Sequence, residues 1–311
     1  MSSAMVCARS VMGRLQRWII GACLLLLAGC SALRLAYGQA PNLMYWWLDG
    51  YVDFEGAQRE RVRDALTAWF AWHRATQLPD YAALLAGAQR QVLHDITPAA
   101  VCRWVEVLRA RLEAGYEQGV PALAEMVHTL DERQLQRIER RFRKADDEFR
   151  DEYLQPTRAD QHAASARRVI ARAERVYGEL DDAQRALLVQ GVADAPFDPQ
   201  LWLHERQLRQ REIVDTLRAL RGERAGAART EAALRLFAAH AAHSPRAPYR
   251  EYQQRLFDHY CRLIARLHDS TTTEQRRHGA ARFAAWEADL RALASERNDA
   301  VRAGVTEAGS R

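Results

Sequence analysis

Histidine is the residue type through which this chain would most readily bind a metal ion, and the sequence contains ten histidines. His240 and His243 are three positions apart, so a helix would place them on one face. A zinc site needs a third protein ligand, and the sequence offers none nearby and no His-Glu-x-x-His or Cys-x-x-Cys motif. The sequence therefore predicts no metal and no other cofactor.

Residue patterns for nucleophilic or acid–base catalysis are equally scarce. The chain has no Gly-x-Ser-x-Gly elbow and no glycine-rich loop that could hold a phosphate. The carboxylate pairs Asp146-Asp147 and Asp181-Asp182 have neighbours typical of a solvated helix surface. We therefore expect no enzyme activity; the alternative is an enzyme whose site is assembled from distant residues.

Cys30, at the end of an apolar run near the N-terminus, is a candidate site for the attachment of lipid. Residues 1–17 carry three arginines and no acidic residue, and residues 18–28 form an almost unbroken apolar run. That run is shorter than the roughly 20 residues that span a bilayer and is typical of a signal peptide. It ends in Leu27-Ala28-Gly29-Cys30, which resembles a lipobox. The resemblance implies a lipoprotein signal peptide at 1–29 and lipid attachment, including palmitate, at Cys30.

Residue 31 bears on the membrane that would receive this lipoprotein. Ser31 stands where an aspartate would resemble an inner-membrane retention signal, so we expect the periplasmic face of the bacterial outer membrane. The inner membrane is the alternative. A plain secretory signal with a chance cysteine, or an uncleaved anchor helix, are the alternatives to lipidation.

Two further cysteines, Cys102 and Cys261, lie in the remainder of the chain. In an oxidising periplasm they are expected to form a disulfide. The alternative is a pair of buried thiols that act as small apolar side chains.

The basic residues are interleaved with acidic ones. The formal net charge of +5 includes the three arginines of the signal, and Lys144 is the only lysine. A nucleic-acid-binding protein needs a one-sided basic face, and none is visible in the sequence. We therefore expect no nucleic-acid partner.

Apolar residues recur at helical spacing from residue 55 onward. Leu135, Ile138, Phe142, Ala145 and Phe149 are spaced by three or four positions and form one stripe. No window shows sustained strand alternation. The sequence therefore predicts an all-α fold, an elongated bundle of about eight to ten helices.

The expected organisation is a signal peptide at 1–29, a lipidated tether at 30–42 and an all-helical domain at 43–305. A division of that domain into two lobes near 156 is an alternative.

Proline, glycine and capping residues mark the expected helix ends. Thr97-Pro98 should begin a helix, Pro79 should separate helices at about 56–76 and 80–93, and Gly115, Gly119 and Pro121 should break or kink the following segment. Other helices are expected at about 131–154, 158–178, 182–193, 198–221, 226–242, 247–269 and 273–303.

One local pattern recurs at expected helix starts. Leu130-Asp131-Glu132-Arg133-Gln134 and Leu180-Asp181-Asp182-Ala183-Gln184 share an apolar residue, a capping aspartate and a glutamine three positions later. Residues 271–275, with Thr272 and Gln275, are a weaker copy, and residues 54–58 are weaker still because glutamate caps poorly. The spacing is that of a capping box, in which the two side chains bond the first-turn amides reciprocally.

This pattern resembles the Leu-Thr-x-x-Gln motif of the Spy/CpxP family of periplasmic stress proteins, although aspartate replaces threonine in the two best copies. The resemblance implies a helical envelope protein, and one member of that family is a chaperone that works without ATP.

A second resemblance covers nearly the whole mature chain. It rests on residues 33–37 (Leu-Arg-Leu-Ala-Tyr), 39–41 (Gln-Ala-Pro), 45–54 (Tyr-Trp-Trp-Leu-Asp-Gly-Tyr-Val-Asp-Phe) and 267–272 (Leu-His-Asp-Ser-Thr-Thr). These segments are similar to an uncharacterised family of proteobacterial lipoproteins known only as a domain of unknown function. The resemblance implies a lipid anchor and a helical fold, and no catalytic residues.

The aromatic residues at 45–54 are the densest such cluster of the mature chain. We expect them to pack into the helical core against the group at 69–72; the alternative is an exposed surface for a membrane or a partner.

The functional hypothesis is a non-catalytic, periplasm-facing lipoprotein that binds partner or client proteins through helical surfaces, in envelope stress. The alternative is a structural scaffold or assembly factor for other envelope proteins.

Replacing Cys30 with Ser should prevent acylation and processing, because the thiol that accepts the lipid is lost. The variant should accumulate as an unprocessed or soluble form, measured by membrane fractionation and by labelling with an acyl-chain analogue. Normal acylation and fractionation of Cys30→Ser would contradict the lipoprotein hypothesis.

Overall fold

The computed structural model describes residues 34–223 and 225–308, with side chains described to residue 295. Within these ranges regular structure is entirely helical, which confirms the all-α prediction. The helices are α2 (Ala40–Val52), α3 (Ala57–Gln91), α4 (Pro98–Val127), α5 (Glu132–Tyr153), α6 (Arg158–Tyr177), α7 (Asp182–Ala193), α8 (Pro199–Gly222), α9 (Ala227–Ala242), α10 (Ala247–Asp269) and α11 (Thr273–Ala308).

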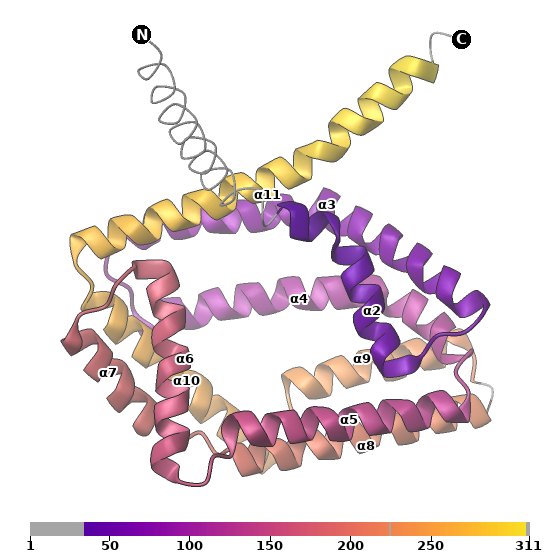
Figure 1. The fold of residues 1–311 in the computed structure, drawn as a ribbon, viewed down its shortest axis with the longest axis horizontal. Helices are drawn as coiled ribbons and strands as arrows, with labels where there is room; N and C mark the ends of the chain where they lie inside the picture. Colours follow the sequence, from indigo (N-terminus) through magenta and orange to yellow (C-terminus); the bar gives the residue numbers. More distant parts are fainter. Residues whose placement is uncertain (1–33, 224, 309–311) are drawn as a thin grey trace, which may run out of the picture.

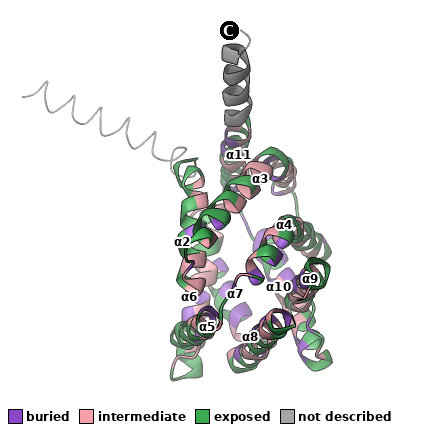
Figure 2. Cartoon of the chain, turned by 90° about the vertical axis from the view of Figure 1, so that its right-hand side faces the viewer, coloured by how far each residue is buried: buried purple, intermediate pink, exposed green. Residues whose placement is uncertain are grey.

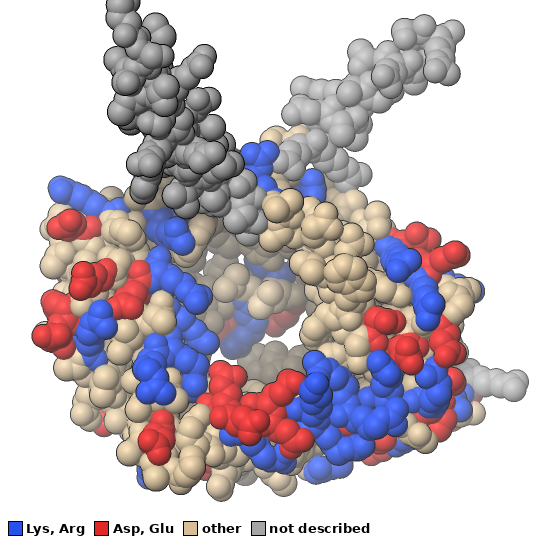
Figure 3. Space-filling model, viewed as in Figure 1, with Lys and Arg blue, Asp and Glu red and all other residues tan. Residues whose placement is uncertain are grey.

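The helices form a frame around a hollow centre (Figure 1). Helix α3 packs along α11 at one edge, and α5 packs along α8 at the opposite edge. Helices α2, α5 and α6 lie on one side of the frame, and α4, α9 and α10 lie on the other (Figure 2). The hollow is visible between the side chains in the space-filling view (Figure 3).

Because the centre is hollow, the apolar side chains are divided among separate clusters. The largest joins α4, α5, α8 and α9 around Val120, Leu135 and Val214. Another joins α7 to α10, where Leu188 and Leu263 are buried. There Gly191 is required for close approach, since a Cβ atom at that position would lie 2.2 Å from Leu263.

The prediction that Pro79 separates two helices is wrong. Helix α3 continues through Pro79, although an interior proline costs a helix about 3 kcal/mol. Gln77, Leu78 and Ala82, which flank the proline, are all buried, so tertiary packing offsets that cost.

Of the break or kink predicted at Gly115, Gly119 and Pro121, the break does not occur, because α4 is one helix from Pro98 to Val127. The two glycines pack against α3, although a Cβ atom at either position would also fit, at 3.4 and 3.9 Å from the nearest ring atom of Trp69. The indole of Trp69 lies against both glycines, and its Nε1 donates to the carbonyl of Gly115 at 2.8 Å.

The expected tether at 30–42 requires a correction as well. Residues 34–38 are helical, and α2 begins at Ala40. The hydroxyl of Tyr37 lies 2.8 Å from Nδ1 of His73, and its ring meets Phe70 edge-on. The chain is therefore docked on α3 from residue 37 onward; Cys30 lies outside the described residues.

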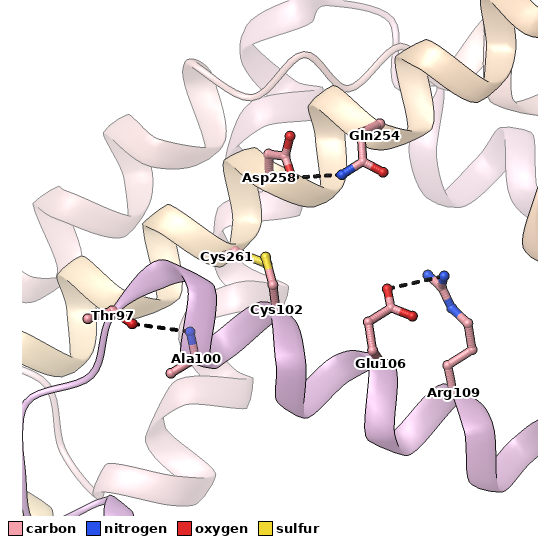
Figure 4. The surroundings of a disulfide bond; sticks show 8 residues. All are labelled: Thr97, Ala100, Cys102, Glu106, Arg109, Gln254, Asp258 and Cys261. Carbon is pink, nitrogen blue, oxygen red and sulfur yellow. Dashed lines mark hydrogen bonds and ion pairs between the residues drawn. A yellow bond between two sulfur atoms is a disulfide. The ribbon is translucent and has the colours of Figure 1, made fainter.

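A disulfide joins α4 to α10. Cys102 and Cys261 are bonded with their Cα atoms 5.5 Å apart (Figure 4). Beside them, Thr97 begins α4 by accepting from the amide of Ala100. The bond links two segments that are 159 residues apart in sequence.

Replacing Cys102 and Cys261 together with Ser should lower the free energy of unfolding by about 3–5 kcal/mol, because the bond restricts a very long loop of the unfolded chain. Urea unfolding followed by circular dichroism measures the difference, with reduced wild-type protein as the comparison. Equal unfolding midpoints for oxidised wild type and the double variant would contradict this prediction.

Candidate functional site

The four copies of the helix-start pattern meet in two pairs. Asp131 and Asp181 each accept from the amide of the glutamine three positions later, and that glutamine accepts from the cap amide. Thr272 makes the same two bonds with Gln275, at 3.1 and 2.9 Å. These bonds are local, but the glutamine side chains also reach across to another helix start.

Gln58 of α3 and Gln134 of α5 bond each other through their amides. The Nε2 of Gln134 donates to Oε1 of Gln58 at 2.8 Å, and the reverse bond is 3.3 Å. Gln134 also donates to the carbonyl of Asp53, and Gln58 to the carbonyl of Thr129. Each glutamine thus closes the turn that precedes the other helix.

Gln184 of α7 and Gln275 of α11 repeat this arrangement. Their reciprocal amide bonds are both 2.8 Å. Gln184 donates to the carbonyl of Ser270, and Gln275 to that of Glu179. In both pairs each amide reaches the carbonyl two residues before the partner's capping position. We call these two pairs the glutamine junctions.

Burial makes the glutamine junctions structurally important. Gln134 and Gln184 are each 2 % exposed, so water cannot replace a lost partner. Sequence reasoning identified the capping residues but missed the cross-helix pairing. The signal was present in the recurrence of glutamine at the same position of all four copies.

An apolar groove is the most distinctive cavity. It has a volume of about 470 Å³ and lies between α3, α4 and α10, with Tyr177 and Phe283 at its edge. We call it the α4 groove. Its lining includes Leu84, Leu85, Val105, Leu108 and Ile264.

Four polar side chains that line the α4 groove, His268, Tyr177, Trp104 and Gln91, form hydrogen bonds within the chain. Nε2 of His268 lies 2.7 Å from the carbonyl of His94, so it carries the proton, and Nδ1 accepts from the hydroxyl of Tyr177 at 2.9 Å. Burial raises the pKa of Tyr177 to about 12, so its hydroxyl stays protonated well above neutral pH. Nε1 of Trp104 donates to Gln91. The groove therefore offers chiefly apolar surface to an occupant.

The α4 groove continues along α4 as a stripe of exposed apolar side chains. Val105, Leu108 and Leu112 are spaced by three and four positions and are 37, 51 and 64 % exposed. Exposure thus increases away from the disulfide. A helix face that is apolar and uncovered over two turns is suited to contact with another apolar segment.

The expectation for the aromatic cluster at 45–54 is only partly right. Tyr45 and Phe54 are buried, whereas Trp46 and Trp47 are 64 and 56 % exposed. The buried pair packs with Val62 of α3 rather than with the expected group at 69–72. The reason is that α2 crosses the beginning of α3, which precedes that group.

Asp146 corrects a further expectation. It was expected on a solvated surface, but it is 3 % exposed and lies 3.0 Å from Nε of Arg206. Gln207 and Gln210 also donate to it, at 3.1 and 3.0 Å. The Asp146 carboxylate therefore holds α8 against α5. The residues next to Asp146 in the sequence do not predict this burial.

A second buried carboxylate fastens α8 to the start of α10. Burial by itself would raise the pKa of Glu205, but hydrogen bonds from Arg246 and Ser244 outweigh it and hold the pKa below its usual value. The charge is thus neutralised within the fold.

His240 and His243 have no third ligand, since the described residues contain no group of three or more metal-binding side chains.

The chain is thus an all-α protein in which glutamine junctions, a disulfide and buried ion pairs hold helices around a hollow centre. Residues 50–234, more than half of the chain, match a family of unknown function (DUF6279), and the chain belongs to that family. No curated protein and no solved structure matches the chain. In the part of the chain that the structure describes, no helix combines the length and apolarity needed to cross a bilayer.

Replacing Gln184 with Leu should lower the free energy of unfolding by about 2–4 kcal/mol, because buried backbone groups at Asp181 and Ser270 would lose their partners. Thermal or urea unfolding measures the loss. Gln190→Leu is the control, since Gln190 is exposed on the same helix and bonds only Asp194 nearby.

A double-mutant cycle with Gln275→Leu tests the pairing itself. The two losses should be clearly non-additive, because each substitution removes the same reciprocal bonds. Additive losses, or a Gln184→Leu variant as stable as wild type, would show that the junction is not energetically important.

Proposed function

We propose that this protein is a non-catalytic, periplasm-facing lipoprotein that binds partner or client proteins in the α4 groove, in a response to envelope stress. The stripe Val105, Leu108 and Leu112 carries the proposal. These side chains extend the groove along α4, and an elongated apolar track suits an amphipathic helix or an unfolded apolar segment. A volume of about 470 Å³ lies within the usual range of binding cavities.

The non-catalytic part of the proposal rests on the chemistry of the lining. Tyr177, His268, Trp104 and Gln91 use their polar groups within the chain. With these groups bonded within the chain, the surface that the groove offers an occupant is chiefly apolar. Binding by apolar contact requires no group that activates a substrate.

Location at the outer membrane is supported by the N-terminal sequence. The lipobox-like ending at Cys30 and the following Ser31 favour a lipid anchor on the periplasmic face. The disulfide between Cys102 and Cys261 is consistent with an oxidising compartment. The Leu-Thr-x-x-Gln-like copies add the likeness to Spy/CpxP stress proteins.

A structural envelope scaffold is the second candidate. The glutamine junctions and the disulfide favour it, because they make a frame that would present fixed surfaces to a fixed partner.

The protein should slow the aggregation of a denatured model client at near-stoichiometric ratios without ATP, as measured by light scattering. Replacing Leu108 and Leu112 together with Gln should largely abolish this effect, because the apolar track becomes polar. The matched control is Val189→Gln with Leu236→Gln; these side chains are 50 and 52 % exposed and lie outside the groove.

Equal client protection by the groove variant and by wild type would contradict the proposal. Crosslinking from position 112 in cells separates the two candidates. Recovery of many client proteins supports the binding function, and recovery of one fixed envelope protein, without any effect on aggregation, supports the scaffold.

A further inference from the structure

Helix α2 is apolar on two sides, but only one side is packed. Tyr45 is 5 % exposed on its inner side, whereas Trp46 and Trp47 project outward. The helix contains no lysine or arginine, and its single carboxylate, Asp49, accepts from the amide of Phe54. An apolar helix side of this kind is characteristic of a surface that meets a membrane interface or a partner.

Four cationic side chains of α5 stand beside the two tryptophans. Trp46, Trp47 and Gly50 share a shallow hollow of about 490 Å³ with these cations, and no acidic residue lines it. The cations are spaced by three, one and three positions, so they occupy one face of α5. They are Arg137, Arg140, Arg141 and Lys144.

Acidic neighbours neutralise only part of this charge. Arg137 lies 3.6 Å from Asp53, and Arg141 lies 3.5 Å from Glu148. Arg140 and Lys144, by contrast, form no ion pair with any described residue. The surface therefore keeps a net positive charge next to exposed indole rings.

Figure 3 shows Lys and Arg side chains gathered along part of α5, beside a patch of Asp and Glu, on the face that also carries the largely uncharged surface of α2. Helix α2 begins at Ala40, ten residues after Cys30, the predicted site of the lipid. The surface is thus close in sequence to the point where the chain would leave the membrane.

We propose that Trp46, Trp47 and the α5 cations bind the anionic phospholipid headgroups of a bilayer surface and orient the protein on it. Tryptophan is favoured at the level of the headgroups, where its ring is apolar and its N–H stays hydrated. Arginine and lysine beside it gain from the negative potential of such a surface. This binding uses a different surface from the α4 groove and does not depend on what that groove binds.

The test uses the full-length chain reconstituted in nanodiscs that contain both phosphatidylglycerol and phosphatidylcholine, with bromine placed on the acyl chains of one lipid or the other. Bromine quenches nearby indoles. Brominated phosphatidylglycerol should quench the tryptophan fluorescence more than brominated phosphatidylcholine does, and high salt should remove the excess. Replacing Trp46 and Trp47 with Phe should abolish the excess as well, which assigns it to these two residues.

Replacing Arg140 and Lys144 with Gln should reduce quenching by brominated phosphatidylglycerol to the level seen with brominated phosphatidylcholine. The matched control is Arg255→Gln with Arg262→Gln, which removes the same charge from α10 on the opposite side of the frame (Figure 2). Circular dichroism of all variants checks that they fold.

Equal quenching by the two lipids in wild type would overturn the proposal, as would an Arg140/Lys144 variant that behaves like wild type. A protein partner would be indicated instead by two results together. Brominated phosphatidylglycerol would fail to quench Trp46 and Trp47, and a soluble acidic peptide would protect the same two indoles from a quencher in solution.

Discussion

The paired glutamine amides are the constraint on which the arrangement of helices depends. A buried amide must have partners for its donors and its acceptor, and Gln134 and Gln184 find them only where two helix starts meet. Each pair therefore fixes α3 against α5, or α7 against α11, although the paired glutamines are 76 and 91 positions apart. All four glutamines donate to an equivalent carbonyl, the one two residues before the capping position of the partner helix. The frame thus contains two equivalent junctions at different corners.

The disulfide and the buried carboxylates complete the frame at other places. Cys102 and Cys261 join α4 to α10, while Asp146 and Glu205 hold α8 against its neighbours. These covalent and ionic contacts let helices meet at their ends and crossings without one continuous core. A hollow arrangement buries less apolar surface than a compact one of equal length, so some helix sides stay uncovered.

The uncovered sides are where the proposed functions lie. The α4 groove is lined mainly by α3, α4 and α10, whereas the Trp46–Trp47 surface is formed by α2 and α5, so the two surfaces share no helix.

The sequence by itself determined the local structure. The apolar spacing of α5 and the caps at Thr97, Asp131 and Asp181 predict helices and their starts, because these depend on neighbours within one turn. Only the tertiary structure decided whether a proline or glycine within a helical segment ends the helix. Pro79 stays inside α3 because buried neighbours offset its cost, and α4 continues past Gly115 and Gly119, against which Trp69 packs. The exposure of Trp46 and the pairing of the glutamines depend on contacts between residues remote in sequence, and the recurrence of glutamine at four helix starts does not by itself tell which starts meet.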